Sequence, residues 1–321
     1  MANIPEWLCR YPYERDEKRP YVMRREEMKL FLYTETFPET SDLNWLITST
    51  DYMTVGEYQL APGSHFSPAD VHAGDEIYYV LRGEVTLMQP EIGQTLVIRQ
   101  GEGVLMPKRC PHIGYNFGES EARMLFMIAP KSWDEKNDIP LEYTGAMKTY
   151  QYTKQQENLQ NCCSKETDEA CISEDGRCCE NTGWRKAATV DDLGAFPVSG
   201  PLSRKERLFY KLTEENSIRM ISGEKTPALL SVWCSNDLIQ FGTIRLLSGG
   251  AGPQQTEFDT HAGDAVFYVL DSPMTFFIKD RNETYDVQPG EYMVIPEGET
   301  YKIINYYGKT TKAVFAVAPK F

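Results

Sequence analysis

Two stretches of this 321-residue chain carry the same pattern of residues 189 positions apart. Residues 70–85 read DVHAGDEIYYVLRGEV and residues 259–274 read DTHAGDAVFYVLDSPM, so Asp70 corresponds to Asp259 (259 − 70 = 189). The offset holds without insertion or deletion as far as the APK sequences at 129–131 and 318–320. A repeat of this kind indicates two homologous domains in tandem, which agrees with the length of the chain.

Each repeat consists of short extended segments. The first contains YQLAPG, EIYYVLRGEVTLMQ, QTLVIRQGEGVLMP, HIGYNF and ARMLFMIAP, and the second contains matching segments such as AVFYVL and AVFAVAP. These segments are rich in β-branched and aromatic residues and are separated by Gly, Pro and Asn, which predicts an all-β barrel or jelly roll. Helical periodicity is weak. Its best candidates are residues 25–35 and 203–216, which we expect to flank the barrels.

The chain is predicted to have three parts. Residues 1–140 form an N-terminal arm and a first barrel, residues 141–205 a cysteine-rich linker or insertion, and residues 206–321 a second barrel. Two interpretations of the linker remain open: a flexible segment with reduced thiols, or a loop held by zinc or disulfides. Its five cysteines are Cys162, Cys163, Cys171, Cys178 and Cys179.

The composition excludes several partners. Asp and Glu number 47 against 33 Lys and Arg, giving a net charge of −14, which argues against binding to nucleic acid or an anionic membrane. The N-terminal residues lack the apolar core of a signal peptide, and no apolar run is long enough to cross a bilayer. The sequence therefore predicts a soluble cytoplasmic protein. The sequence is also compatible with a homodimer formed through residues 20–50.

The residues around the repeated pattern resemble the two motifs of the cupin superfamily. In the first motif a glycine precedes His-x-His, and a glutamate and a second glycine follow; the second motif has a glycine, Pro-x-Gly, a histidine and an asparagine. The first repeat departs from these motifs at three points: Asp70 replaces the first histidine, one extra residue follows Gly63, and Arg109 replaces the glycine of Pro-x-Gly. The matching residues are Gly63, His72, Glu76 and Gly83 in the first motif, and Gly101, Pro107, His112 and Asn116 in the second.

The resemblance implies a bicupin: two tandem cupin barrels, each a double-stranded β-helix or jelly roll, with a few short helices. It also implies one divalent metal ion, Mn, Fe or Zn, in the first barrel. Its ligands would be Asp70, His72, Glu76 and His112. The residue types agree, because imidazoles and carboxylates suit these metals and residues two apart on a strand share a face. All four histidines of the chain, at positions 65, 72, 112 and 261, fall within the two cupin-like cores.

The second repeat lacks two of the expected ligands. Ala265 replaces the glutamate and Tyr301 replaces the second histidine, while Asp259 and His261 are kept. Two ligands are too few for a closed or catalytic site, so no metal is expected in the second barrel. Because Asp259 persists without a metal site, the Asp-x-His pair has a structural interpretation as well, which leaves the role of Asp70 open.

Two further residues are candidates for proton transfer. His65 is a candidate acid or base that acts beside the metal ligands, or a replacement for Asp70 as a ligand. Tyr78 is two residues from Glu76 on the same predicted strand, so both side chains should face the barrel interior.

A metal with open positions can hold a small substrate by two oxygens and act as a Lewis acid. The two carboxylates at the site favour redox-quiet Mn or Zn, and therefore non-oxidative chemistry. We expect hydrolysis, including carbon–carbon cleavage, or isomerisation of a small diketone, hydroxy ketone or sugar acid. The alternatives are an Fe(II)-dependent dioxygenase and a non-catalytic small-molecule-binding cupin. The family's functions are too diverse for the resemblance to decide among them.

Overall fold

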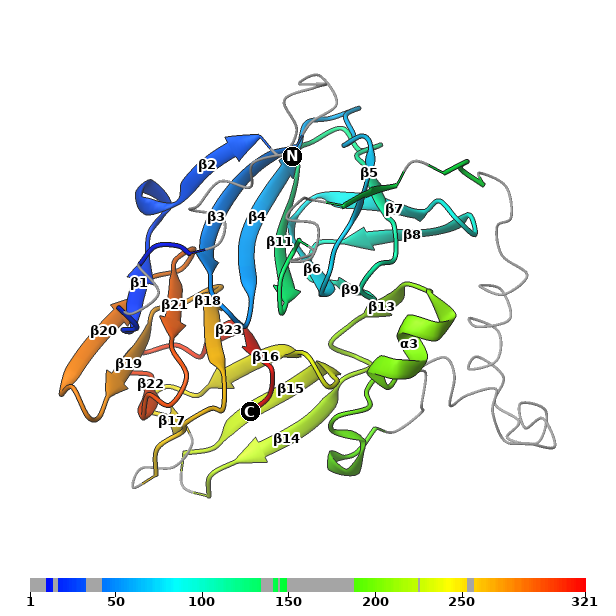
Figure 1. Ribbon diagram of the computed structural model, residues 1–321. Coiled ribbons are helices and arrows are strands. Elements are labelled where there is room, and N and C mark those ends of the chain that lie inside the picture. The colour runs from blue at the N-terminus through cyan, green and yellow to red at the C-terminus, as the bar shows by residue number, and fades with distance from the viewer. Residues whose placement is uncertain are drawn as a thin grey trace.

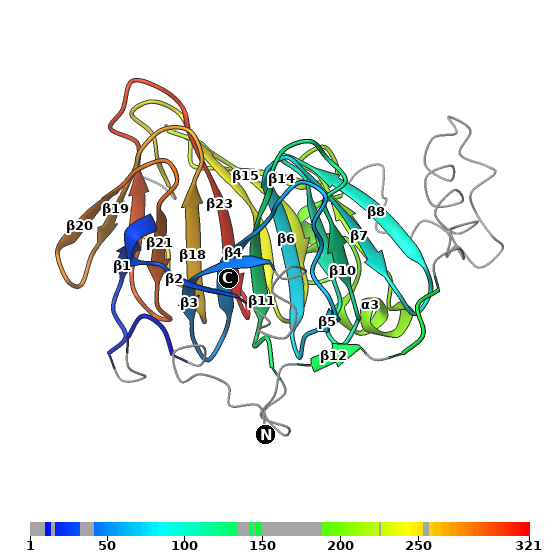
Figure 2. The ribbon, with the colours of Figure 1, turned by 90° about the horizontal axis from the view of Figure 1, so that it is seen from above.

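The protein folds into two β-barrels that lie side by side (Figures 1 and 2). The computed structural model describes residues 10–13, 17–32, 42–133, 141–143, 145–148, 188–224, 226–252 and 257–321. The cysteine cluster of the predicted linker lies outside these residues. None of the described helices is long and apolar enough to span a membrane.

The first barrel is built on a seven-stranded antiparallel sheet. Two smaller sheets complete it: β10 (Ile113–Tyr115), β7 (Glu84–Gln89) and β8 (Gln94–Arg99) form one, and β12 (Leu141–Tyr143) with β5 (Ala69–Val71) forms the other. In spatial order the large sheet contains β13 (Tyr210–Leu212), β9 (Gly103–Met106), β6 (Asp75–Arg82), β11 (Ala122–Ala129), β4 (Thr54–Leu60), β3 (Leu43–Ser49) and β2 (Lys29–Leu32).

The second barrel repeats this arrangement. Its smaller sheet contains β17 (Ala251–Gly252), β22 (Tyr301–Ile304), β19 (Met274–Ile278) and β20 (Glu283–Val287). Its seven-stranded sheet contains β1 (Tyr21–Met23), β21 (Tyr292–Ile295), β18 (Asp264–Val269), β23 (Thr311–Ala318), β16 (Gln240–Leu246), β15 (Ala228–Ser235) and β14 (Ile218–Ser222). The predicted all-β fold of two tandem barrels is confirmed.

The two barrels exchange their first strands. Strand β1 precedes the first barrel but pairs with β21 of the second, where Tyr21 is opposite Val294. Strand β13 precedes the second barrel's own strands but pairs with β9 of the first, where Tyr210 is opposite Leu105. Both pairings obey the offset of the sequence repeat, because 210 − 21 and 294 − 105 are each 189. Each large sheet is therefore completed by the other half of the chain.

Successive residues of a strand alternate between the interior of their own barrel and the contact with the other barrel. In β6, Ile77 and Tyr79 belong to a buried cluster that also contains Trp233 and Phe241 of the second half. Tyr78, between them, faces the core of the first barrel. Successive strand residues point to opposite faces, so one strand serves both contacts.

The predicted helices are shorter than their sequence segments. Residues 25–27 form a 3₁₀ turn, η1 (Arg25–Glu27), and the chain then enters β2, where Leu30 is opposite Trp45. The second segment contributes to α3 (Gly200–Glu206), after which the chain enters β13. A further 3₁₀ turn is η3 (Val190–Asp192). Strand pairing outweighs local helix propensity in both segments.

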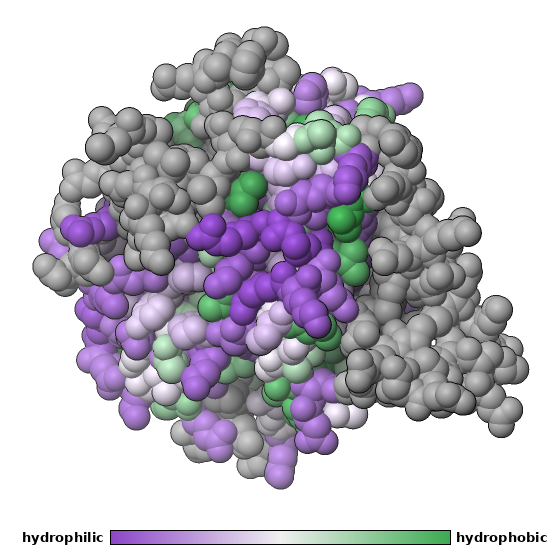
Figure 3. Space-filling model, turned by 45° about the vertical axis from the view of Figure 1, so that its right-hand side comes forward, coloured by the Kyte–Doolittle hydropathy of each residue, from purple (hydrophilic) through white to green (hydrophobic). Residues whose placement is uncertain are grey.

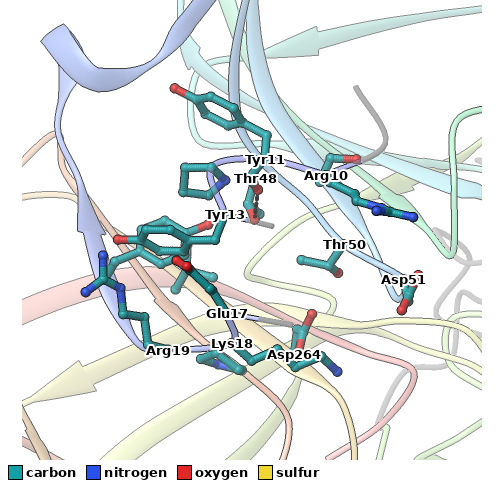
Figure 4. A pocket seen from close by; sticks show the side chains of 15 residues that line it. Arg10, Tyr11, Tyr13, Glu17, Lys18, Arg19, Thr48, Thr50, Asp51 and Asp264 are labelled. Carbon is teal, nitrogen blue, oxygen red and sulfur yellow. Dashed lines mark hydrogen bonds between the residues drawn. The ribbon is translucent and has the colours of Figure 1, made fainter. Parts of the chain in front are cut away.

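The described surface in Figure 3 is mainly hydrophilic, with hydrophobic side chains in small separate patches. A cavity of ≈ 70 Å³ lies where the N-terminal segment crosses towards the second barrel (Figure 4). Its lining includes Tyr11, Tyr13, Thr48 and Asp264. No histidine or cysteine is among the described residues that line it.

Candidate metal centre

Backbone pairing brings two of the predicted ligands together. Asp70, in β5, forms an antiparallel bridge with His112, just before β10. The Asp70 N–H donates to the His112 carbonyl at 2.8 Å, and the His112 N–H donates to the Asp70 carbonyl at 3.0 Å. Together with His72, the next residue but one, their side chains offer donor atoms that all lie within 4.8 Å of one another.

Both histidines present Nε2 to the barrel interior. The Nδ1 atom of His72 lies 3.1 Å from the Ser132 carbonyl, and Nδ1 of His112 lies 3.4 Å from the Cys110 carbonyl. A carbonyl oxygen can only accept, so each Nδ1 carries the proton and each Nε2 keeps its lone pair. Such hydrogen bonds to the distal nitrogen are the usual support of a metal-binding imidazole.

Glu76 completes this arrangement from β6. Its Oε2 lies 3.1 Å from Nε2 of His112 and 3.4 Å from Nε2 of His72. The atom is buried and has no partner with hydrogen-bond geometry among the described residues. Donors that each lie about 2.1 Å from one ion are separated by roughly 3.0–3.4 Å, so these spacings suit a shared divalent cation.

Burial sets the electrostatics of the centre. Asp70, His72, Glu76 and His112 are all at most 7% exposed. Burial lowers the pKa of His72, although the Glu76 carboxylate opposes the shift. A neutral imidazole is the form that binds a metal. The two imidazoles therefore fit a divalent cation with either carboxylate: Asp70 belongs to the same compact group of donors, and the buried Oε2 of Glu76 lies 3.1 and 3.4 Å from the two Nε2 atoms.

The two residues proposed for proton transfer lie in different places. The hydroxyl of Tyr78 is 3.1 Å from Nε2 of His112, and Tyr78 lines the cavity beside the centre. Burial raises the pKa of Tyr78 well above 10, so the phenol keeps its proton. The ring of His65 instead stacks on Tyr115, with centroids 5.4 Å apart, and His65 is not among the described residues that line the cavity. A role for His65 stays a prediction.

The cavity beside the centre is small, at ≈ 30 Å³. Its lining includes three polar residues that the sequence motifs did not indicate: Asp42, Asn44 and Tyr58. They lie upstream of the motifs, on or next to β3 and β4. They belong to no motif in the sequence, because their position depends on which residues of these strands face the cavity.

The equivalent place in the second barrel has different chemistry. Asp259 pairs with Tyr301 as Asp70 pairs with His112, but the Tyr301 ring belongs to the hydrophobic core. The Tyr301 hydroxyl lies 2.6 Å from Nε2 of His261, and burial lowers the pKa of His261 to about 4. Ala265 supplies no carboxylate. That the second barrel holds no metal stays a prediction.

Residues 56–128 match the cupin domain family. No curated protein sequence matches the chain. Among solved structures, salicylate 1,2-dioxygenase from Pseudaminobacter salicylatoxidans aligns with a TM-score of 0.56 and 14% identity, covering 83% of this chain and 71% of that one. A mutant of Bacillus subtilis oxalate decarboxylase aligns with a TM-score of 0.53 and 14% identity, covering 94% and 77%.

AerE from Microcystis aeruginosa aligns with a TM-score of 0.52 and 12% identity, covering 91% of this chain and 96% of that one. Identities this low establish the fold and nothing finer. Residues 56–128 therefore form a cupin domain, and the whole chain has the fold of two such barrels. Two of these structural neighbours are named as enzymes, a dioxygenase and a decarboxylase.

Proposed function

We propose that the first barrel is the active site of a metal-dependent hydrolase or isomerase that acts on a small, oxygen-rich carbonyl compound. The observation that carries the proposal is the convergence of two imidazole Nε2 atoms on the unpartnered Oε2 of Glu76. Asp70, His72, Glu76 and His112 would hold Mn or Zn. When bound, the metal would act as a Lewis acid towards substrate oxygens.

The protein's own residues supply the rest. The backbone carbonyls of Ser132 and Cys110 orient the two imidazoles, and the apolar walls that Phe126 and Ile128 contribute limit water in the cavity. Tyr78, protonated and next to His112, is the candidate proton donor to a substrate oxygen. Two carboxylates balance the charge of a divalent cation, which supports a hard, redox-quiet metal.

Metal content tests the proposal. We expect protein purified without added metal to contain about one Mn or Zn per chain by elemental analysis, and His112→Ala to contain only background amounts, because a buried ligand is removed. The matched control is His261→Ala in the second barrel, which should keep the wild-type content. Equal metal in the wild type and in His112→Ala would refute the proposal.

Oxygen dependence separates the two enzymatic classes. The two-histidine-one-carboxylate set and the likeness in fold to a dioxygenase support Fe(II)-dependent dioxygenation as the second candidate. We expect turnover of a 1,3-diketone or a hydroxy ketone to proceed at the same rate with and without air. Stoichiometric oxygen uptake, with iron as the bound metal, would favour the dioxygenase instead.

A further inference from the structure

The cavity has a second polar surface besides the metal centre. It consists of Asp42, Asn44 and Tyr58, here called the Asp42 cluster, which are 6%, 3% and 1% exposed. Asn44 Nδ2 donates to Asp42 Oδ2 at 2.9 Å and to the Asp42 carbonyl at 3.3 Å. All three residues line the same cavity as Glu76 and Tyr78. The cluster is therefore held in place at a small space that it shares with the proposed ligands.

Tyr58 brings a hydrogen-bond donor to this surface. Its hydroxyl is buried beside Tyr78, whose ring centroid lies 4.9 Å away and whose hydroxyl interacts with it. Burial raises the pKa of Tyr58 well above 10, so the hydroxyl stays protonated. A buried phenol that faces the cavity is therefore placed to donate a hydrogen bond to a ligand there.

The second barrel shows that the fold does not require these polar groups. Upstream of the motifs the offset between the repeats is 186. Gly56 of β4 lies opposite Phe126, and Gly242 of β16 lies opposite Phe315, so β3 and β4 correspond to β15 and β16 with 242 − 56 = 186. The β-bulge between β3 and β4 also recurs between β15 and β16. At this offset the residues equivalent to Asp42, Asn44 and Tyr58 are Ala228, Leu230 and Ile244.

The polar cluster is thus confined to the barrel that has the metal-type residues. Where Glu76 and His112 are replaced, the cluster is replaced by apolar side chains too, and that barrel packs around them. A role in folding alone does not account for the difference. We attribute the difference to what the first barrel binds.

We propose that the Asp42 cluster recognises a hydroxyl group of the substrate, and that the first barrel therefore selects neutral hydroxy ketones against carboxylates. This inference rests on the proposed function. A hydroxyl can donate to the Asp42 carboxylate and accept from the Tyr58 phenol, so it can form a hydrogen bond with both residues at once. A carboxylate can only accept, and it would leave Asp42 facing another acceptor.

Charge favours the same substrate class. Asp42, Asp70 and Glu76 bring three carboxylates to one cavity, one more than the charge of a divalent cation can balance. Burial raises the pKa of Asp42 to about 6, and the neighbouring Glu76 carboxylate contributes in the same direction. An anionic substrate would add to this repulsion, whereas a neutral one would not.

Two probes and three variants test the proposal by isothermal titration calorimetry on Mn(II)-loaded protein. The probes are dihydroxyacetone, a neutral hydroxy ketone, and oxalate, a dianion without a hydroxyl. Asp42→Ala, which copies the second barrel, should weaken dihydroxyacetone binding about tenfold and strengthen oxalate binding about fivefold or more. Tyr58→Phe should weaken dihydroxyacetone binding about tenfold.

Asp42→Asn separates the two effects, because it removes the charge and keeps an acceptor oxygen. It should strengthen oxalate binding as Asp42→Ala does, but weaken dihydroxyacetone binding less. Each variant should keep the wild-type Mn stoichiometry at a saturating Mn(II) concentration, so that both probes are compared on fully loaded protein. The inference is overturned if dihydroxyacetone fails to bind the Mn-loaded wild type, or if its Kd changes less than twofold in both Asp42→Ala and Tyr58→Phe. A wild type that binds no Mn would instead overturn the proposed function.

Discussion

Arg204→Met is expected to lower the free energy of unfolding by about 3–5 kcal/mol, because it leaves a buried carboxylate without its cation. Asp75 is 0% exposed, and Arg204 donates to it through Nε at 3.2 Å and Nη2 at 2.8 Å. Asn236 Nδ2 and the backbone N–H of Lys108 also donate to Asp75, at 2.9 and 2.8 Å. Guanidinium unfolding followed by tryptophan fluorescence measures the loss.

The double variant Arg204→Met/Asp75→Asn identifies the cause. If the uncompensated charge of Asp75 dominates, neutralising it should recover at least half of the loss. If the two substitutions instead destabilise additively, the guanidinium contributes by packing and not by charge. Asp237 is a weaker partner of Arg204, since its side chain is 51% exposed, and it serves as the surface control in Asp237→Asn.

This ion pair also supports the candidate metal centre. Asp75 directly precedes Glu76 in β6, and the N–H that it accepts belongs to Lys108, in the turn that leads to His112. Arg204 comes from α3, and Asn236 follows β15 of the second barrel. We therefore expect Arg204→Met to weaken Mn binding as well as folding. The second half of the chain thereby contributes to the geometry of a site that lies in the first.

The fold was predictable because the repeat preserves its spacing. The offset of 189 that relates Asp70 to Asp259 also sets the strand registers of Tyr21 and Tyr210. The exchange of β1 and β13 was not predictable, since each is three residues long and pairs with a strand outside its own half. So short a segment has too little pattern to indicate which sheet it joins.

The site was predictable where chemistry and spacing coincide. His72, Glu76 and His112 lie together as their spacing indicated. The roles of Asp75 and Asp264, by contrast, do not follow from the glycine that precedes each: both residues begin a strand, and each accepts a backbone N–H from a distant turn. Such a role depends on tertiary contacts that no local pattern records.

The second large effect is expected at Glu57, where the free energy of unfolding should fall by about 3 kcal/mol in Glu57→Ala. This side chain is 1% exposed and lies at the contact between the barrels. It accepts from Arg25 at 3.0 Å, from Arg123, and from the hydroxyl of Tyr292 in the second barrel. The loss of unfolding free energy should lie at the lower end of the range that is usual when a buried ion pair is broken. Arg25 and Arg123 are 41% and 26% exposed and can regain water, whereas the buried Tyr292 hydroxyl cannot.

Thr243 provides the matched control for Glu57. At the offset of 186 it is the equivalent residue of the second barrel, and it is 0% exposed with no hydrogen bond from Oγ1 to a described residue. Thr243→Val should therefore change stability by less than about 1 kcal/mol, since it removes no ion pair. Glu57→Ala should also leave Mn binding unchanged, in contrast to Arg204→Met, because none of the partners of Glu57 adjoins a proposed ligand. If Glu57→Ala and Arg204→Met lower the Mn affinity equally, the Mn affinity depends on overall stability and not on the contact at Asp75.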